Sequence, residues 1–175
     1  MVEQKIGEKV IRLVRGDITD LEVDAFVYDI TEDCQLGSGY GGAIISRGGK
    51  AIQDQLAAVG RCATGEAIVT SGGKLKAKSI IHVNGPKFCE PDARQKLAKA
   101  IGAVLARAEE KGLKTLALPP LGTGLYQVPL DMSANVLVAA VKEHLKNSSS
   151  LREVVFVALD SREYQPFAAQ IQGGN

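Results

Sequence analysis

The sequence predicts an α/β fold in which helices cover both faces of a largely parallel sheet. Short apolar runs rich in β-branched residues alternate with segments of helical spacing, and glycine or proline ends most of these runs. The later apolar runs do not alternate with polar residues, which is typical of strands covered on both faces. Strands separated by helices are joined by crossovers, so we expect a three-layer α/β/α architecture with a mixed, largely parallel sheet.

The first half of the chain contains four predicted strands and two helical segments. Four glycines crowd into residues 36–44, ahead of a stretch rich in Ala and Ile that is interrupted at Gly48 and Gly49. The predicted elements, in order, are a strand within 9–19 that breaks at Gly16, a strand at 24–30, a helical stretch after the glycines, a helix at 50–60, and strands at 65–72 and 78–86.

The second half of the chain alternates helices with short apolar strands. Residues 91–112 place apolar side chains on one face and Lys and Glu on the other, which indicates an amphipathic helix from Pro91 to Gly112. The apolar run at 114–120 is too short for a helix and ends in two prolines. The remaining predictions are a helix at 129–147, a turn at 148–150, a strand at 153–160 and a short helix at 161–172.

Composition and charge narrow the class of protein. The chain has 175 residues, 45% hydrophobic and 23% charged, so we expect one domain over residues 1–175 with a sizeable core. A net charge of +1 argues against nucleic acid or an anionic membrane as a partner. No run approaches the roughly 20 apolar residues of a membrane span. A phosphate-bearing ligand would have to be held locally, by backbone dipoles.

Cysteine and histidine usage indicates a reduced protein without a metal centre. Cys34, Cys62 and Cys89 show no paired spacing, which fits reduced thiols better than a disulfide framework. The start of the sequence lacks the apolar region of a signal peptide, so we expect a cytoplasmic location. The two histidines, His82 and His144, cannot assemble a histidine-rich site, and we expect no metal and no cofactor.

Two glycine-rich loops mark the candidate ligand site. Residues 37–42 and 122–124 each lie between a predicted strand and a predicted helix, where ligands of open α/β sheets bind. Glycine lets the backbone approach a ligand and turns successive N–H groups toward one point. Neither loop is a P-loop or a dinucleotide fingerprint, and a single such loop is often required by turn geometry alone. Two facing loops would form a diphosphate clamp that needs no lysine.

An acidic residue after the first predicted strand has two interpretations. Asp17 lies in the sequence RGDIT. In the structural interpretation its carboxylate caps the following turn. In the functional one it accepts hydrogen bonds from an exocyclic amine, while the backbone of Ile18 contacts the adjacent ring edge. Beside two phosphate loops, such a carboxylate favours a nucleotide ligand.

Five segments resemble the macro domain family, in order and over nearly the whole chain. They are RGDITDLEVDAFV (15–27), GSGYGGAI (37–44), ATGEAIVTSGGKLKAKSIIHVNGP (63–86), LGTGLYQVP (121–129) and VVFVALDSREYQPF (154–167). The resemblance implies a mixed sheet of six or seven strands between helices. It also implies that ADP-ribose lies across the crest of that sheet.

The resemblance implies a role for each part of the site. Asp17 would bind the adenine amine, with Ile18 beside it. A frequent aromatic residue of the family falls on Leu159, so ring stacking at the adenine end would be replaced by apolar contact. Further ligand contacts are expected from Gly39, Tyr40 and Gly41 at the distal ribose and phosphates, and from Gly122, Thr123, Gly124, Leu125 and Tyr126 around the diphosphate, with Tyr126 also beside the distal ribose.

One segment departs from the family pattern. Where many members have NAAN, this chain has YDIT at 28–31. The family's final asparagine, which contacts the distal ribose and is needed for cleavage in hydrolytic members, falls on Thr31, so Thr31 is also a candidate ligand-binding residue. Thr31 offers one rotatable hydroxyl in place of a planar amide. Asp29 adds a carboxylate that would either repel the diphosphate or serve as a new general base. Thr31 and Asp29 are therefore the candidate catalytic residues, and the expected hydrolysis is slow or absent.

The resemblance implies a binding module for ADP-ribose or a related adenine nucleotide derivative, free or protein-attached. The alternative is a hydrolase of ADP-ribose derivatives, acting on mono-ADP-ribosyl-protein, O-acetyl-ADP-ribose or ADP-ribose 1″-phosphate. Contact with nucleic acid or poly(A) through the adenine pocket is a third hypothesis, which the net charge of +1 disfavours. A scaffold domain whose pocket has diverged toward another nucleotide is a fourth. The sequence gives no signal for an oligomeric state.

Overall fold

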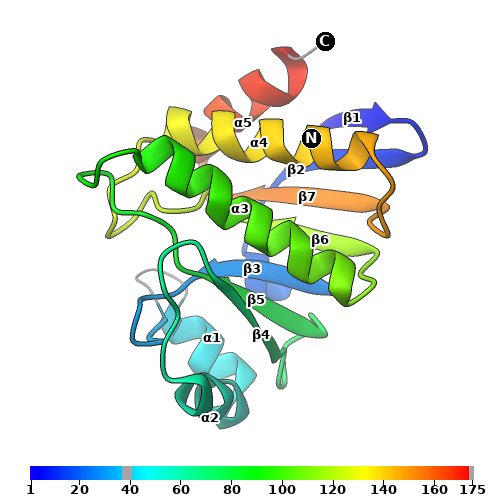
Figure 1. Ribbon diagram of the computed structural model, residues 1–175. Helices are drawn as coiled ribbons and strands as arrows, with labels where there is room; N and C mark the ends of the chain where they lie inside the picture. Colours follow the sequence, from blue (N-terminus) through cyan, green and yellow to red (C-terminus); the bar gives the residue numbers. More distant parts are fainter. Residues whose placement is uncertain (37–40, 174–175) are drawn as a thin grey trace.

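The computed structural model describes residues 1–36 and 41–173, which form a seven-stranded sheet with helices on both faces (Figure 1). The strands are β1 (Val2–Ile6), β2 (Lys9–Arg15), β3 (Ala25–Asp29), β4 (Ala67–Ser71), β5 (Ser79–Val83), β6 (Thr115–Leu118) and β7 (Glu153–Ala158). The helices are α1 (Gly41–Gly48), α2 (Lys50–Val59), α3 (Ala93–Glu110), α4 (Leu130–Lys146) and α5 (Ser161–Gly173), with a 3-10 turn at Ile18–Asp20.

The order of the strands across the sheet is β1-β2-β7-β6-β3-β5-β4. Strands β2, β7, β6, β3 and β5 run parallel to one another, while β1 and β4 are antiparallel edge strands. The predicted three-layer architecture with a mixed, largely parallel sheet is therefore confirmed. Because five parallel strands end at the same edge, the loops that follow them are brought together there.

The core consists of one apolar layer on each face of the sheet. Alternate residues of the central strands point to opposite faces: Val27 packs toward α3, α4 and α5, whereas Phe26 packs toward α1 and α2. In Figure 1, α3 and α4 lie in front of the sheet, and α1 and α2 lie at the bottom of the view. Burial on both faces explains why the central strands read as continuous apolar runs.

The sequence predictions missed one strand and placed the start of one helix too early. Strand β1 was not predicted, although Val2, Gln4 and Ile6 are the partly buried positions of a period-2 pattern that pairs with β2. Helix α3 begins at Ala93 and not at Pro91, because Asp92 has a left-handed backbone with φ of 56° that a right-handed helix cannot include.

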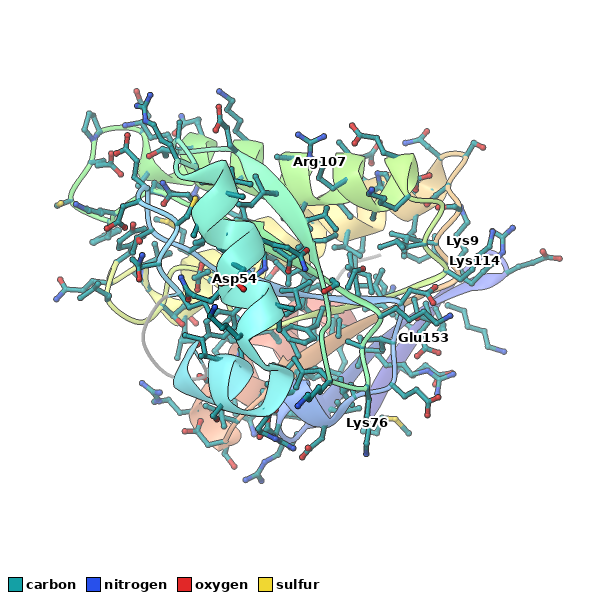
Figure 2. All side chains as sticks on the ribbon, turned by 90° about the horizontal axis from the view of Figure 1, so that it is seen from below. Lys9, Asp54, Lys76, Arg107, Lys114 and Glu153 are labelled. Carbon is teal, nitrogen blue, oxygen red and sulfur yellow. The ribbon has the colours of Figure 1, made fainter. Side chains whose placement is uncertain are left out.

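Charged residues gather where the parallel strands begin, at the edge opposite their carboxyl ends. Lys9 and Glu153 are the first residues of β2 and β7, and Lys114 directly precedes β6; Figure 2 shows the three side by side. Lys9 Nζ donates to the carbonyls of Leu145 and Asn147 at 3.0 and 2.8 Å, which caps the end of α4. This edge is stabilised by its own ion pairs and caps, and the cavity described below lies at the other edge.

Within residues 1–36 and 41–173, no helix has both the length and the apolar character needed to cross a membrane. In the same part of the chain, no three His, Cys, Asp or Glu side chains are grouped so that they could hold a metal ion.

Glu109 connects α3 to the end of α4 and to the turn before β7. Its Oε1 lies 2.8 Å from His144 Nε2 and accepts a hydrogen bond from the Ser149 hydroxyl, and its Oε2 accepts from the Ser150 backbone N–H at 3.0 Å. Burial alone would raise the pKa of this carboxyl, but the bonds from Ser149 and Ser150 and the contact with His144 lower it to about 2. The ionised carboxylate is therefore part of the folded structure at neutral pH.

Replacing Glu109 with glutamine is expected to lower the free energy of unfolding at pH 7 by about 1–2 kcal/mol, because charge-assisted hydrogen bonds are lost. The folded-state pKa lies below the unfolded value of roughly 4.3. The contribution of Glu109 to the free energy of unfolding is thus present above that unfolded pKa and is lost as the pH falls toward 2. Urea titrations at pH 7 and pH 3 should show the difference between the two proteins shrinking at pH 3. Glu110→Gln, which removes an exposed pair with Arg107, is the control, and an equal loss in both variants would contradict the assignment.

Candidate functional site

The largest concentration of predicted site residues lies around a cavity of about 160 Å³ at the carboxyl edge of the sheet. Its walls come from the loops that follow four parallel strands. They include Gly16 and Ile18 after β2, Ile30 and Thr31 after β3, the segment from Pro119 to Tyr126 after β6, and Leu159 after β7. The cavity therefore lies beyond the carboxyl ends of the strands, where ligands of open α/β sheets bind.

The loop after β6 is held firmly against the cavity. Leu121 exchanges two hydrogen bonds with the buried Ser133 hydroxyl of α4, its N–H donating at 3.1 Å and its carbonyl accepting at 2.9 Å. The Val128 N–H closes the loop by donating to the Gly122 carbonyl at 2.9 Å. Gly122 has φ of 75°, and a Cβ there would lie 2.9 Å from Val128 Cγ2, so a larger residue would be strained and would have to displace Val128. The predicted residues Gly122, Thr123, Gly124, Leu125 and Tyr126 all line the cavity.

Asp29, the last residue of β3, also lines the cavity and is partly exposed there. Its Oδ2 accepts a hydrogen bond from the Gly122 N–H at 3.3 Å, so the carboxyl lies directly beside the loop. Burial raises the pKa of Asp29 to about 7, against the opposing effect of the Gly122 hydrogen bond. The structure thus places an acid that titrates near neutral pH next to the backbone that was predicted to hold a diphosphate.

Thr31 lies in the cavity wall, but its hydroxyl is engaged within its own turn. The Thr31 hydroxyl donates to the Asp33 carboxylate, lies 3.1 Å from the Gln35 carbonyl, and accepts from the Gln35 N–H at 3.1 Å. The backbone reinforces the turn, because the Thr31 N–H donates to the Gln35 carbonyl at 2.9 Å. A hydroxyl carries one proton and two lone pairs, so little of it remains for a ligand or an attacking water.

Tyr126 is anchored by a residue that sequence reasoning missed. Its hydroxyl donates to Oδ1 of Asn84 at 3.2 Å, and Asn84 Nδ2 donates to the Cys62 carbonyl at 2.8 Å. Asn84 is buried directly after β5, and the Phe88 N–H adds a bond to the Tyr126 carbonyl at 2.9 Å. The only signal for Asn84 in the sequence was that it is a polar residue between an apolar strand and Gly85. Asn84 therefore fixes the aromatic ring at one end of the cavity.

Two apolar side chains contribute to the cavity wall away from Tyr126. Ile18 is buried and Leu159 is 53% exposed, and both contribute to the lining. The carboxylate of Asp17 is used elsewhere: Oδ1 accepts from the Thr19 N–H at 2.8 Å and from its hydroxyl at 2.6 Å, and Oδ2 lies 3.2 Å from Arg47 of α1. Asp17 thus caps the 3-10 turn, as in its structural interpretation. Its contact with an adenine amine stays a prediction.

The other glycine-rich loop is only partly described. Gly39 and Tyr40, predicted at the distal ribose, lie outside the described residues. Gly41 is the first residue of α1 and is buried, with its ideal Cβ position 3.1 Å from Leu36 Cβ. It does not belong to the lining that the described residues form around the cavity. The structure therefore explains the glycine at position 41 by its tight packing against Leu36.

The family model of the Macro domain matches residues 30–137. The chain belongs to the macro domain family. A macro domain-containing protein of Caldanaerobacter subterraneus subsp. tengcongensis is 37% identical over 164 residues, which cover 90% of this chain and 93% of that protein. The resemblance stated from the sequence motifs is thus confirmed.

Solved macro domains have the same fold. A macrodomain of Oceanobacillus iheyensis with MES bound superimposes with a TM-score of 0.91 over 98% of this chain and 95% of its own; at 23% identity, it supports the fold alone. A macrodomain of Trypanosoma brucei in complex with ADP-ribose is 29% identical, with a TM-score of 0.83 over 90% of this chain and 67% of its own. The seven-stranded sheet of this macro domain is therefore that of the family.

One relative carries an enzymatic name. The ADP-ribose glycohydrolase MACROD2 of Xenopus laevis is 36% identical to this macro domain over 159 residues, which cover 89% of this chain and 38% of that protein. The region shared with this longer protein thus includes nearly all of the macro domain.

Proposed function

We propose that this macro domain, acting as a single domain over residues 1–175, binds ADP-ribose or a related adenine nucleotide derivative, free or protein-attached. The observation that carries the proposal is the cavity at the carboxyl edge, which is lined by the glycine loop 122–126 together with Ile18 and Leu159. The Trypanosoma brucei macrodomain solved with ADP-ribose supports the choice of ligand. We also propose a cytoplasmic location, which the three free cysteines support.

The cavity offers a different chemistry to each part of such a ligand. Ile18 and Leu159 provide apolar contact for adenine at one end. The glycine loop brings backbone toward the diphosphate, which suits an anion in a protein with a net charge of only +1. Tyr126 would pack beside the distal ribose at the other end, where Asn84 holds its hydroxyl. Gly39 and Tyr40 remain proposed contacts from the resemblance.

Hydrolysis is the second candidate function, and two observations favour it. MACROD2 is named as a glycohydrolase, and Asp29 places a carboxyl with a pKa of about 7 in the cavity, as a general base requires. The Thr31 hydroxyl counts against it, because that group is engaged by Asp33 and Gln35 and has little capacity left to orient water. We therefore propose binding as the main function, with slow or absent hydrolysis.

ADP-ribose is expected to bind about tenfold more tightly than AMP, because the second phosphate adds at least one charge-assisted hydrogen bond to the loop. Adenosine, which lacks both phosphates, should bind more weakly than AMP. Calorimetric titration of the three ligands under the same buffer conditions tests the proposal. Equal affinities for AMP and ADP-ribose would show that the loop holds no diphosphate.

A further inference from the structure

A second, larger hollow adjoins the first cavity. It has a volume of about 940 Å³, and the described residues that line it come from the loops after β3, α2, β5 and β6. Thr31, Leu125 and Tyr126 line both spaces, so the two meet at the end assigned above to the distal ribose. Nothing in the proposed contacts with ADP-ribose uses the remaining walls of this hollow, which include Arg61, Thr64 and Cys89.

The position of the hollow indicates what it would hold, and this step rests on the proposed function. If the distal ribose packs beside Tyr126, the group attached to that ribose projects past Tyr126 and Thr31. The hollow begins at those two residues. A volume of about 940 Å³ accommodates several amino-acid residues. The space is therefore suited to the molecule that carries the ADP-ribose, and free ADP-ribose would leave it open.

The charges around the hollow favour a cationic occupant. Glu90 is paired at 3.8 Å with Lys96, which is not part of the lining. The described residues that line the hollow carry three carboxylates, from Glu32, Asp33 and Glu90, and two cations. One of these cations, Arg61, already donates two hydrogen bonds to Glu32, at 3.0 and 2.8 Å. The other, Lys87, has its Nζ 5.8 Å from the centre of the Tyr126 ring. Burial and the surrounding carboxylates of Asp29, Glu90, Asp33 and Glu32 together raise the pKa of Tyr126, which reflects the negative potential here.

We propose that this hollow is a binding site for a basic peptide segment that carries mono-ADP-ribose, with the nucleotide in the first cavity and the flanking lysine or arginine side chains near the carboxylates. A second ADP-ribose unit of a polymer would bring a diphosphate to the same carboxylates and is disfavoured. The protein would thus bind both the ADP-ribose and the peptide segment to which it is attached.

Cys89 provides a direct probe of occupancy. It lines the hollow and is exposed, whereas Cys34 and Cys62 are buried. The native protein is incubated with N-ethylmaleimide in the presence of saturating ADP-ribose, or of a synthetic peptide with a mono-ADP-ribosylated serine flanked by arginines and lysines. The peptide conjugate should slow alkylation of Cys89 at least about fivefold, because a thiol reacts only when accessible. Free ADP-ribose should leave the rate within about twofold. The Cys89→Ser variant lacks this thiol and therefore shows which part of the measured alkylation belongs to Cys89.

Thr64 provides a matched test of charge. It is exposed and lines the hollow but not the first cavity. Thr64→Lys should weaken the basic conjugate about two- to fivefold and Thr64→Glu should strengthen it by a similar factor, the scale of exposed ion pairs. Thr64→Gln serves as the neutral control of similar size. All three variants should bind free ADP-ribose like the wild-type protein, and a conjugate with glutamates in place of the basic residues should show the opposite order.

The outcomes separate this inference from the proposed function. If no ligand binds, both are overturned. If free ADP-ribose binds but the conjugate neither protects Cys89 nor responds to Thr64, only the inference is overturned. Equal or tighter binding of an ADP-ribose dimer, with protection of Cys89, would assign the hollow to polymer instead. Protection of Cys89, together with an affinity for the basic conjugate that rises from Thr64→Lys through Thr64→Gln to Thr64→Glu, would establish the peptide site.

Discussion

Replacing Gly124 with glutamate is expected to abolish ADP-ribose binding. Gly124 is exposed and lines the cavity in the loop proposed to hold the diphosphate. A new carboxylate about 5 Å from the phosphates would cost about 3 kcal/mol at an effective dielectric of about 20, or a loss of at least about 100-fold. Steric exclusion of the ligand adds to this. Calorimetric titration of the variant at pH 7 should detect no binding of ADP-ribose.

Gly124→Gln is the matched control for this variant, since glutamine has nearly the same size and no charge. It should retain weak binding, and the difference between the two variants measures the electrostatic part. Because position 124 is exposed, both proteins should unfold at temperatures close to that of the wild type. A folded Gly124→Glu protein that still binds ADP-ribose would show that this loop is only structural.

Asp29→Asn is expected to bind ADP-ribose about 30-fold more tightly than the wild type at pH 8.5 and equally at pH 6. The wild-type carboxyl has a pKa of about 7. Below that pKa it is neutral and compatible with a diphosphate. Above it the carboxyl must take up a proton when the ligand binds, which costs a factor of about ten for each pH unit. Asparagine is always neutral and can still accept the Gly122 hydrogen bond.

Binding measured from pH 6 to 8.5 tests this linkage. The wild-type affinity should fall with rising pH, while the affinity of Asp29→Asn should stay flat; parallel curves would show that Asp29 does not face the ligand. The same two proteins test hydrolysis of mono-ADP-ribosylated protein and of O-acetyl-ADP-ribose. Robust turnover by the wild type that vanishes in Asp29→Asn would overturn the proposal of slow or absent hydrolysis and make Asp29 a general base.

Much of the fold was predictable because its signals are local. Apolar runs and glycine breaks located six of the seven strands, as well as the loop from Gly122 to Tyr126 at the carboxyl edge. Strand β1 escaped notice because Val2, Gln4 and Ile6 are only partly buried and lie between charged residues. Asn84 escaped because nothing in the sequence distinguishes a side chain that supports Tyr126 from any other polar residue after a strand.

The sequence by itself determined the order of the layers, the edge where the loops meet and the presence of an unusual carboxyl at position 29. Only the tertiary structure decided what these groups do, because each answer depends on a partner distant in the chain. Asp29 meets Gly122, 93 positions away, and its burial there raises the pKa to about 7. Tyr126 meets Asn84 across 42 positions. Such contacts arise when parallel strands bring their ends to one edge. They cannot be predicted from the spacing of residues along the chain.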